Sequence, residues 1–198
     1  MAGDPGLSNL VLFLFESGYL KRAVRQGWQI AGVAEAESVA EHSFRAAVIG
    51  YAVAVLEGAD PERTAVLCLF RYLPEARLTY VPSTEKLQLA EAVIAHQASG
   101  LPVALRDRLR WLIAEIGDGE SPEAMCARDA DALECLLQAR EYDAIGELDA
   151  QPWIATMVAA VQTSTGKNLA AAACETQPVD WWNAIVASYG RPAGQPVE

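Results

Sequence analysis

One histidine stands on a helical face that is otherwise apolar. His42 shares that face with Val39, Ala46, Ile49 and Val53, so we expect its imidazole to project toward the interior. An imidazole in such a place can be a metal ligand, a general acid or a general base. It can also be a hydrogen-bonded residue of the core, and the periodicity leaves these interpretations open.

A carboxylate on a later helix raises a similar question. The residues one turn from Asp131 are small on one side and charged or polar on the other: Ala127, Arg128, Glu134 and Cys135. Asp131 therefore suits the wall of a cavity, where a cation or strong donors must accompany it because a dry, unpaired carboxylate is costly. The alternative is a solvent-facing Asp on a helix that also carries Asp129 and Glu134.

Helices are the elements expected to position these residues. Ser38 and Glu41 form a capping-box pattern, Asp60-Pro61 and Ser121-Pro122 open further helices, and Ser83 caps another. The residue before a proline disfavours helix, so the helix carrying Arg71 should end near Pro74. The expected helices span residues 7–24, 38–56, 61–73, 83–98, 103–116, 122–142, 152–162, 168–174 and 179–188, with loops at 28–37 and 77–82.

The composition fits one all-α domain. The 198 residues are 52% apolar, with short β-branched runs, and no linker or repeat divides the chain. Residues 1–198 are therefore predicted to form a single helical domain, with 190–198 as a flexible tail. The apolar runs at 10–15 and 46–56 are shorter than a membrane span, and no secretory signal is visible, so we expect a cytoplasmic protein without a membrane partner.

Charge and cysteine usage narrow the function classes. The formal net charge of −11 argues against a nucleic-acid polymer as partner, because such ligands are gripped through basic grooves. The four cysteines are scattered without a Cys-x-x-Cys pair, which favours buried free thiols over a metal or redox cluster.

Several separated segments resemble one family. Residues 37–43 (ESVAEHS), 128–134 (RDADALE) and 137–142 (LQAREY) are similar to the metal-binding segments of the HD-domain hydrolases, in the branch of small 5'-deoxynucleotidase-like phosphohydrolases. Residues 20–22, with Arg25 and Gly27-Trp28, resemble that family's phosphate-binding loop. The terminal Asp180-Trp181-Trp182 also looks familiar, and together the motifs cover nearly the whole chain in the family's order.

The resemblance implies a fold and a set of roles. It implies an all-α HD-domain helical bundle with a central polar pocket, and a homodimer. His42 and Asp131 match the first and last metal ligands, and Glu75 matches the acidic residue that assists the attacking water. Arg25 matches the substrate-phosphate Arg, and Trp28 belongs to the same ligand-binding segment.

The chain departs from the family pattern in the middle of this set. In the segment LFRYLPEAR (69–77), Arg71 and Tyr72 stand where the family has its His-Asp pair, and Tyr80 stands where it usually has an Asp. A guanidinium has no lone pair for a metal, and a neutral phenol is a poor ligand for hard cations. We therefore expect a degenerate metal site and no cofactor, or alternatively one weakly held divalent metal on His42, Glu75 and Asp131.

A charge argument suggests what stands in the ion's place. If Arg71 points inward, its guanidinium lies among Glu75 and Asp131 and acts as a fixed internal cation in place of the metal. The alternative is an Arg71 that points to solvent. Tyr72 and Tyr80 can donate hydrogen bonds to an oxyanion or act as acids, or they simply fill space.

Three functions remain compatible with the sequence. The first is a repurposed, metal-independent enzyme that binds an anionic small molecule through Arg25 and Arg71 and transfers protons through His42, Glu75, Asp131 or the tyrosines. The second is a residual metal-dependent nucleoside monophosphate phosphohydrolase. The third is a non-catalytic pseudoenzyme or binding module. Fold resemblance alone does not choose among them.

Overall fold

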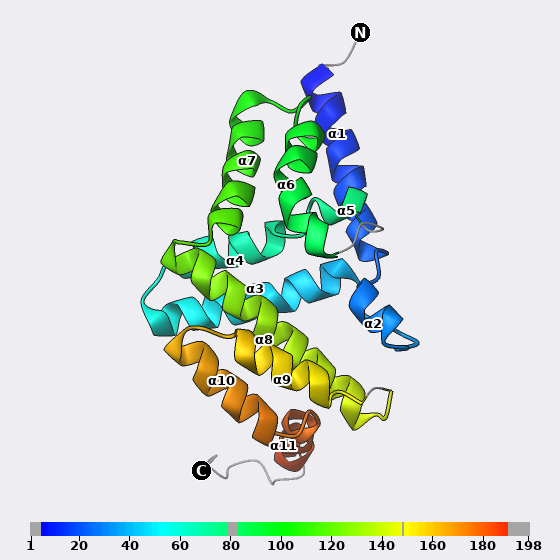
Figure 1. The fold of residues 1–198 in the computed structure, drawn as a ribbon, viewed down its shortest axis with the longest axis vertical. Helices are drawn as coiled ribbons and strands as arrows, with labels where there is room; N and C mark the ends of the chain where they lie inside the picture. Colours follow the sequence, from blue (N-terminus) through cyan, green and yellow to red (C-terminus); the bar gives the residue numbers. More distant parts are fainter. Residues whose placement is uncertain (1–4, 79–82, 148, 190–198) are drawn as a thin grey trace.

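The computed structural model describes residues 5–78, 83–147 and 149–189, and these residues form helices joined by short connections (Figure 1). Within these ranges, strand-like pairing is limited to one isolated antiparallel bridge between Val24 and Ser38. The all-α prediction is confirmed. The helices are α1 (Pro5–Ser17), the 3-10 helix η1 (Gly18–Lys21), α2 (Gln26–Ile30), α3 (Val39–Glu57), α4 (Pro61–Phe70), α5 (Glu75–Leu78), α6 (Ser83–Gln97), α7 (Val103–Asp118), α8 (Pro122–Ala144), α9 (Gln151–Ala160), α10 (Ser164–Glu175) and α11 (Asp180–Tyr189).

The central helices begin at the caps that the sequence indicates. The Ser38 hydroxyl accepts a hydrogen bond from the Glu41 amide at 3.2 Å, and the Glu41 carboxylate accepts one from the Ser38 amide at 2.7 Å. Asp60 and Ser121 cap α4 and α8 in the same manner, each followed by a proline. Gly58 ends α3 in the left-handed region, at φ 75°, where a side chain would be strained.

Four local predictions are wrong in detail. The helix expected over 7–24 is interrupted, because α1 ends at Ser17 and the chain tightens into η1 at Gly18. The loops expected at 28–37 and 77–82 give way in part to the short helices α2 and α5. The helix expected to reach residue 73 ends at Phe70: ahead of Pro74, the Leu73 amide donates to the Phe70 carbonyl, so Arg71 caps α4 and Tyr72 lies in a turn.

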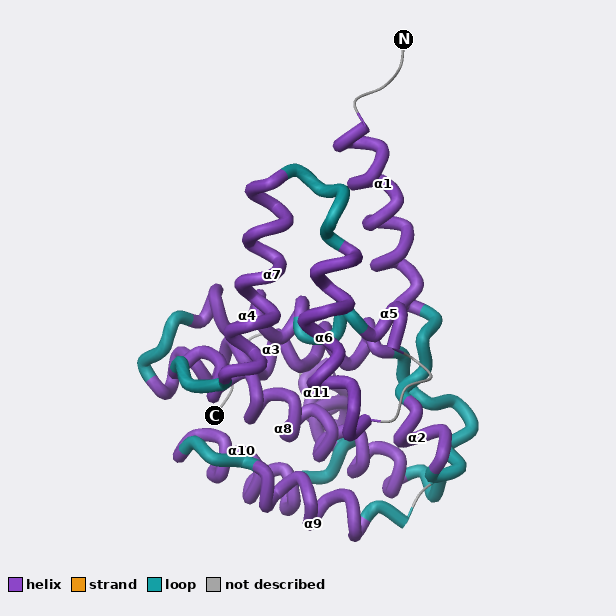
Figure 2. The backbone as a smooth tube through the Cα atoms, turned by 45° about the horizontal axis from the view of Figure 1, so that its top comes forward, coloured by secondary structure: helices purple, strands orange, loops and turns teal. Residues whose placement is uncertain are grey.

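Three helices form the middle of the molecule. Helices α3, α4 and α8 pack on one another, with α6 and α7 on one side and α9 and α10 on the other (Figures 1 and 2). At Gly50, α3 and α4 approach so closely that an added Cβ would lie 2.8 Å from the Cys68 sulfur. This close approach brings the end of α4, and with it Arg71 and Tyr72, toward α3.

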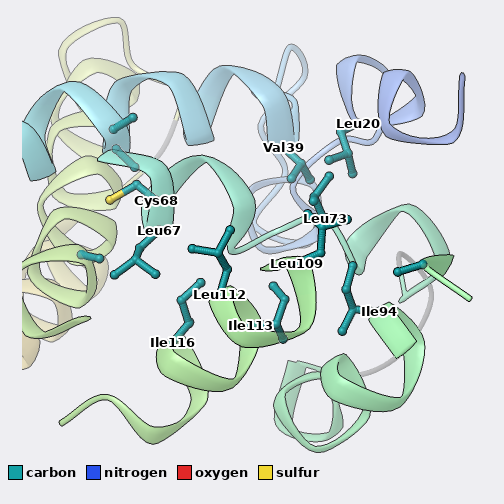
Figure 3. Packing of buried hydrophobic residues seen from close by; sticks show 14 of the residues in the cluster. Leu20, Val39, Leu67, Cys68, Leu73, Ile94, Leu109, Leu112, Ile113 and Ile116 are labelled. Carbon is teal, nitrogen blue, oxygen red and sulfur yellow. The ribbon is translucent and has the colours of Figure 1, made fainter. Parts of the chain in front are cut away.

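Two apolar cores flank the central layer. The first joins α4 and α7 with the start of α3, and Figure 3 shows Leu67, Leu109, Leu112 and Ile113 among its members. The second gathers Trp28 with the later part of α8, α9 and α10. Residues of α8 contribute to both cores, so this helix is held along its length and can fix the position of a polar side chain between them.

Helix α3 passes a test for membrane-spanning helices. By length and composition it is apolar enough to cross a membrane, with a mean hydropathy of 1.3 over its best window. In this structure 44% of that window is buried against the neighbouring helices. The apolar character of α3 therefore extends beyond the run at 46–56.

A candidate active site at the crossing of α3 and α8

His42 lies at the centre of a buried polar cluster. Its side chain is fully buried, and both ring nitrogens face carboxylates of α8. The Nε2 atom lies 2.8 Å from Asp131 Oδ1, and Nδ1 lies in close hydrogen-bonding contact with Glu134 Oε2. Only the imidazolium form can donate to both carboxylates at once, so the geometry favours a charged ring.

On the Nδ1 side, Glu134 is held by an arginine from the helix that carries His42. Arg45 Nε lies 3.0 Å from Glu134 Oε1, and its two terminal nitrogens contact Gln138 and Glu141, each at 2.7 Å. Glu134 is buried and Glu141 is 43% exposed. Arg45 thus connects the buried carboxylate to the molecular surface.

On the Nε2 side, Asp131 meets the two residues at the end of α4. The Tyr72 hydroxyl donates a hydrogen bond to Asp131 Oδ1 at 2.5 Å, and Arg71 Nη2 lies 3.7 Å from Asp131 Oδ2. Arg71 therefore points inward. The ion pair joins one guanidinium nitrogen to one carboxylate oxygen.

A second arginine reaches the cluster from the segment before α2. Arg25 Nη2 contacts the Cys135 sulfur at 3.0 Å, and its Nε lies 3.4 Å from Glu37 Oε1. Its Cζ lies 5.4 Å from the centre of the Tyr72 ring, and the Cζ of Arg71 lies 5.7 Å from the same centre. Two guanidiniums therefore share one phenol ring.

Arg25 contacts Glu37, and Glu37 in turn is held by Trp28. The Trp28 indole donates to Glu37 Oε1 at 2.9 Å, and the Glu37 amide donates to the hydroxyl of Tyr142 at 2.9 Å. Trp28 is 1% exposed and packs against Trp153 and Tyr142. The residue expected to contact substrate thus lies in the second core and orients Glu37.

Burial and charge shift the protonation equilibria of the cluster. Burial acts to raise the pKa of Asp131, but Arg71 and the hydrogen bond from His42 outweigh it and hold the pKa well below its usual range. Burial opposes the charged form of His42, yet its bonds to Asp131 and Glu134 raise its pKa. Burial, with the charge of Glu134, raises the pKa of Glu37 to about 7. Burial also raises the pKa of Tyr72, which keeps its proton.

The structure brings most of the sequence-predicted site residues together. Arg25, His42, Arg71, Tyr72 and Asp131 form one connected group around the end of α4. Glu75 is the partly buried first residue of α5, four residues after Arg71 along the chain. Tyr80 lies outside the described residues.

Four members of the cluster escaped sequence reasoning: Glu37, Arg45, Glu134 and Cys135. One alternative from the sequence places Glu134 on a solvent-facing helix, yet its exposure is 0%. A signal was present in the spacing, since Arg45 follows His42 and Glu134 follows Asp131 by three residues, so each pair lies on one helical face. Because α3 and α8 cross at these positions, the pair on α3 faces the pair on α8 and all four side chains come into contact.

The expectation of no cofactor is wrong, because the cluster contains a group that could hold a metal ion. The ligand atoms of His42, Glu134 and Cys135 all lie within 4.8 Å of one another, and all three residues are buried. Imidazole, carboxylate and thiolate together form a donor set suited to zinc and similar transition metals. The ligand positions that the resemblance implies fit an ion less well, since Arg71 and Tyr72 beside Asp131 offer no suitable ligand.

The cluster is reached from two sides. The side chains of Arg25, Arg71 and Asp131 are 19%, 18% and 22% exposed, so solutes have partial access on the Nε2 side of His42. On the Nδ1 side, a groove of about 790 Å³ runs between α3 and α8 and is lined by Glu37, Arg45, Glu134 and neighbouring residues.

Comparison with known proteins agrees with this architecture. The HD domain family model matches residues 17–173. The 5'-deoxynucleotidase HDDC2 proteins of Bos taurus and Homo sapiens are each 30% identical over 190 residues, covering 86% of this chain and 92% and 93% of those proteins.

Solved structures show the same fold. A conserved hypothetical protein from Pyrococcus furiosus is 28% identical with a TM-score of 0.57, covering 76% of this chain and 98% of that chain. A protein from Magnetospirillum magnetotacticum described as a predicted metal-dependent phosphohydrolase is 22% identical with a TM-score of 0.65, covering 96% of this chain and all of that one. With its helical architecture, its polar cluster and this family match, the chain belongs to the HD domain family.

Proposed function

We propose that this protein binds the phosphate group of a nucleoside monophosphate or a similar small phosphate ester and hydrolyses the ester bond. One observation carries the proposal: Arg25 and Arg71 approach the same Tyr72 ring beside Asp131, and both are partly accessible. The related 5'-deoxynucleotidases, by their name, act on nucleotides of this class.

Two guanidiniums suit a phosphate for electrostatic and geometric reasons. Arginine keeps its charge at all physiological pH values and presents donors in a fork that matches phosphate oxygens. The charge of Asp131 offsets the repulsion between the two arginines. Burial alone would lower the pKa of both guanidiniums, but Asp131 raises the pKa of Arg71, and Tyr72 and Cys135, followed by Asp131, raise the pKa of Arg25. Partial exposure of both side chains leaves a path for the ligand.

Asp131 is the residue best placed to orient an attacking water. Its Oδ1 is fixed by His42 and Tyr72, and its Oδ2 faces Arg71. A water molecule that donates to Oδ2 would lie near a phosphate held by Arg71. In the reaction the water oxygen joins phosphorus, the bond to the ester oxygen breaks, and that oxygen leaves with a proton as the alcohol.

A transition-metal ion would be held by His42, Glu134 and Cys135, and when bound it would supply positive charge and acidify water. Binding requires the Nδ1 proton of His42 and the thiol proton of Cys135 to leave. Burial raises the pKa of Cys135 to about 12, so without an ion the residue stays a thiol despite its contact with Arg25.

Phosphate release tests this proposal. The purified chain is incubated with the four common 5'-deoxynucleoside monophosphates, with and without Zn²⁺, Mn²⁺ or Co²⁺, and binding of the same nucleotides is measured by calorimetry. We expect Arg71→Ala and Arg25→Ala each to weaken nucleotide binding about tenfold or more, in line with loss of a charged hydrogen bond. Arg106→Ala, on the exposed face of α7, is the matched control.

Three outcomes separate the candidate functions. Metal-stimulated phosphate release that Asp131→Ala abolishes supports the proposed hydrolase. Nucleotide binding without release under any metal supports a binding module that has kept the arginines and lost the chemistry. Binding that is unchanged in both arginine variants overturns the proposed phosphate site.

A further inference from the structure

The short helix α5 follows directly on the turn that carries Arg71 and Tyr72. In that turn the Leu73 amide donates to the Phe70 carbonyl at 3.1 Å, and the Glu75 amide donates to the Tyr72 carbonyl at 2.9 Å. Helix α5 itself has only four residues. A single helical turn is unstable in isolation, because its nucleation costs more than its few hydrogen bonds contribute. Contacts with other elements must therefore fix this segment.

Arg77 of α5 binds the end of α1 through a paired contact. Its Nε lies 2.5 Å from Glu16 Oε1, and its Nη2 lies 2.8 Å from Glu16 Oε2. Two parallel bonds between a guanidinium and a carboxylate fix orientation as well as distance. Glu16 is the penultimate residue of α1, where the negative end of the helix dipole disfavours a carboxylate. The Arg77 cation therefore stabilises the end of α1 as well as α5.

Two residues of α6 complete this network. Arg77 Nη1 contacts His96 Nδ1, which must supply the lone pair because a guanidinium can only donate. The amide nitrogen of the buried Gln97 donates to Glu16 Oε1 at 2.9 Å and to the Leu73 carbonyl at 3.4 Å. The segment after α4 is thus held at two points, Leu73 and Arg77. We name the four residues Glu16, Arg77, His96 and Gln97 the Arg77 clamp.

The clamp is attached to two helices that also meet elsewhere. The Asn9 side chain of α1 donates to the Gly100 carbonyl, just after α6, at 3.1 Å. An added Cβ at Gly100 would lie 2.7 Å from the Asn9 amide nitrogen, so the two segments approach closely. In Figures 1 and 2, α5 lies near the C-terminal end of α1 and next to α6. Helices α1 and α6 therefore form a frame that can hold α5 in place.

Arg71 depends on its backbone for its direction. Its Nη2 lies 3.7 Å from Asp131 Oδ2, which is an ion pair but is longer than a hydrogen bond. Its Cζ lies 5.7 Å from the centre of the Tyr72 ring, a contact that restricts the direction of the guanidinium only weakly. A shift of the turn would therefore move the guanidinium away from Asp131.

We propose that Arg77 is a positioning residue for the phosphate site, because the clamp fixes the turn between α4 and α5 and thereby sets the direction of the Arg71 guanidinium. Among the described residues, the Arg77 side chain bonds to Glu16 and His96 and not to Asp131, so it acts on the site only through the turn. This inference rests on the proposed function, since Arg71 is the phosphate ligand that Arg77 positions.

Hydrogen exchange read by mass spectrometry tests the hold on the turn. Arg77→Met removes the charge and the donors but keeps an apolar stem, and we expect the amides of residues 71–78 to exchange about tenfold faster. The amides of α8 should exchange at an unchanged rate. Arg106→Met is the matched control, because the Arg106 side chain is 34% exposed, against 36% for Arg77, and pairs with its neighbour Asp107.

Nucleotide binding tests the effect on Arg71. With deoxyadenosine 5'-monophosphate as the probe in calorimetry, Arg77→Met should weaken binding about threefold to tenfold. Arg77→Lys, which can still reach Glu16 but lacks the fork, should recover part of that loss. In an Arg71→Ala background, Arg77→Met should change the affinity less than about twofold, because the residue that it positions is absent. A purely structural role would give the same loss in both backgrounds.

The two measurements separate this inference from the proposed function. Faster exchange confined to residues 71–78, together with a loss of affinity that Arg71→Ala removes, supports the positioning role. Unchanged exchange at 71–78, or exchange that rises equally in α8, overturns the clamp. Equal losses of affinity in the two backgrounds overturn the action through Arg71. If the wild-type chain binds no nucleotide, the proposed phosphate site fails, and the exchange rates alone decide whether Arg77 holds the turn.

Discussion

The two sides of the His42 ring differ in composition, access and chemistry. On the Nε2 side, Asp131 meets Tyr72 and Arg71 in a region that is partly open. On the Nδ1 side, Glu134 is fully buried and held by Arg45. The open side suits ligand binding, and the closed side sets the charge and orientation of the ring. The His42 imidazole thus connects a partly exposed carboxylate to a fully buried one.

The largest difference should appear when each carboxylate is removed. Glu134→Ala leaves Arg45 and His42 without their buried counter-charge, so we expect the free energy of unfolding to fall by about 3–5 kcal/mol in urea titrations. Glu141→Ala, which removes the exposed partner of Arg45, should cost no more than about 1 kcal/mol. Equal losses in the two variants would show that the closed side is not held by its buried charges.

Asp131→Ala should have a smaller effect on stability. Water can reach the partly exposed site and solvate Arg71, so we expect a loss of about 1–2 kcal/mol in the same titration.

Metal content should also differ between variants on the Nε2 side and the Nδ1 side of His42. By elemental analysis, Asp131→Ala should keep its metal because Asp131 is outside the group of His42, Glu134 and Cys135, whereas Glu134→Ala should lose it. The reverse pattern would move the ion to the Nε2 side.

The pH dependence of stability should report the protonation of Glu37, the carboxylate that contacts Arg25. The folded pKa of Glu37 is about 7, above its ordinary value of 4.5, so the folded state holds this proton more tightly than the unfolded state does. Its contribution is fully present below pH 4.5 and is lost as the pH rises through 7. We expect Glu37→Gln to remove about 1–2 kcal/mol of the decline in unfolding free energy between pH 5 and pH 7.5. An unchanged pH profile would mean that Glu37 titrates normally.

The smallest expected change in stability comes from the thiol. Cys135→Ser keeps the size of the side chain and a hydrogen-bond acceptor for Arg25, so we expect a loss of about 1 kcal/mol or less in thermal unfolding of the metal-free protein. The same variant should bind Zn²⁺ at least tenfold more weakly. Cys174→Ser, at the exposed cysteine, is the matched control. Equal affinity in both variants would remove Cys135 from the metal site.

The sequence predicted one side of the ring much better than the other. His42, Asp131, Arg71 and Tyr72 stand in segments that resemble a family pattern, so their proximity could be expected before the fold was known. The resemblance gives no role to Glu134 or Arg45, and on a helix that carries several charges the sequence does not distinguish a buried Glu from a solvated one. Trp28 shows the converse error: its segment suggested a ligand contact, but its indole supports Glu37 from within the core.

The sequence by itself determined the helical class, the main caps and breaks, and the presence of Arg71 and Tyr72 in a segment that resembles a metal-binding one, because these depend on local backbone preferences and on the identity of single side chains. Only the tertiary structure determined which charged side chains are buried and which partners they contact. The close approach of α3 and α4 at Gly50 and the crossing of α3 and α8 bring residues about ninety positions apart within hydrogen-bonding distance. Burial and charge pairing depend on that packing, so the inward turn of Arg71, the buried Glu134 and the group of His42, Glu134 and Cys135 followed only from the fold.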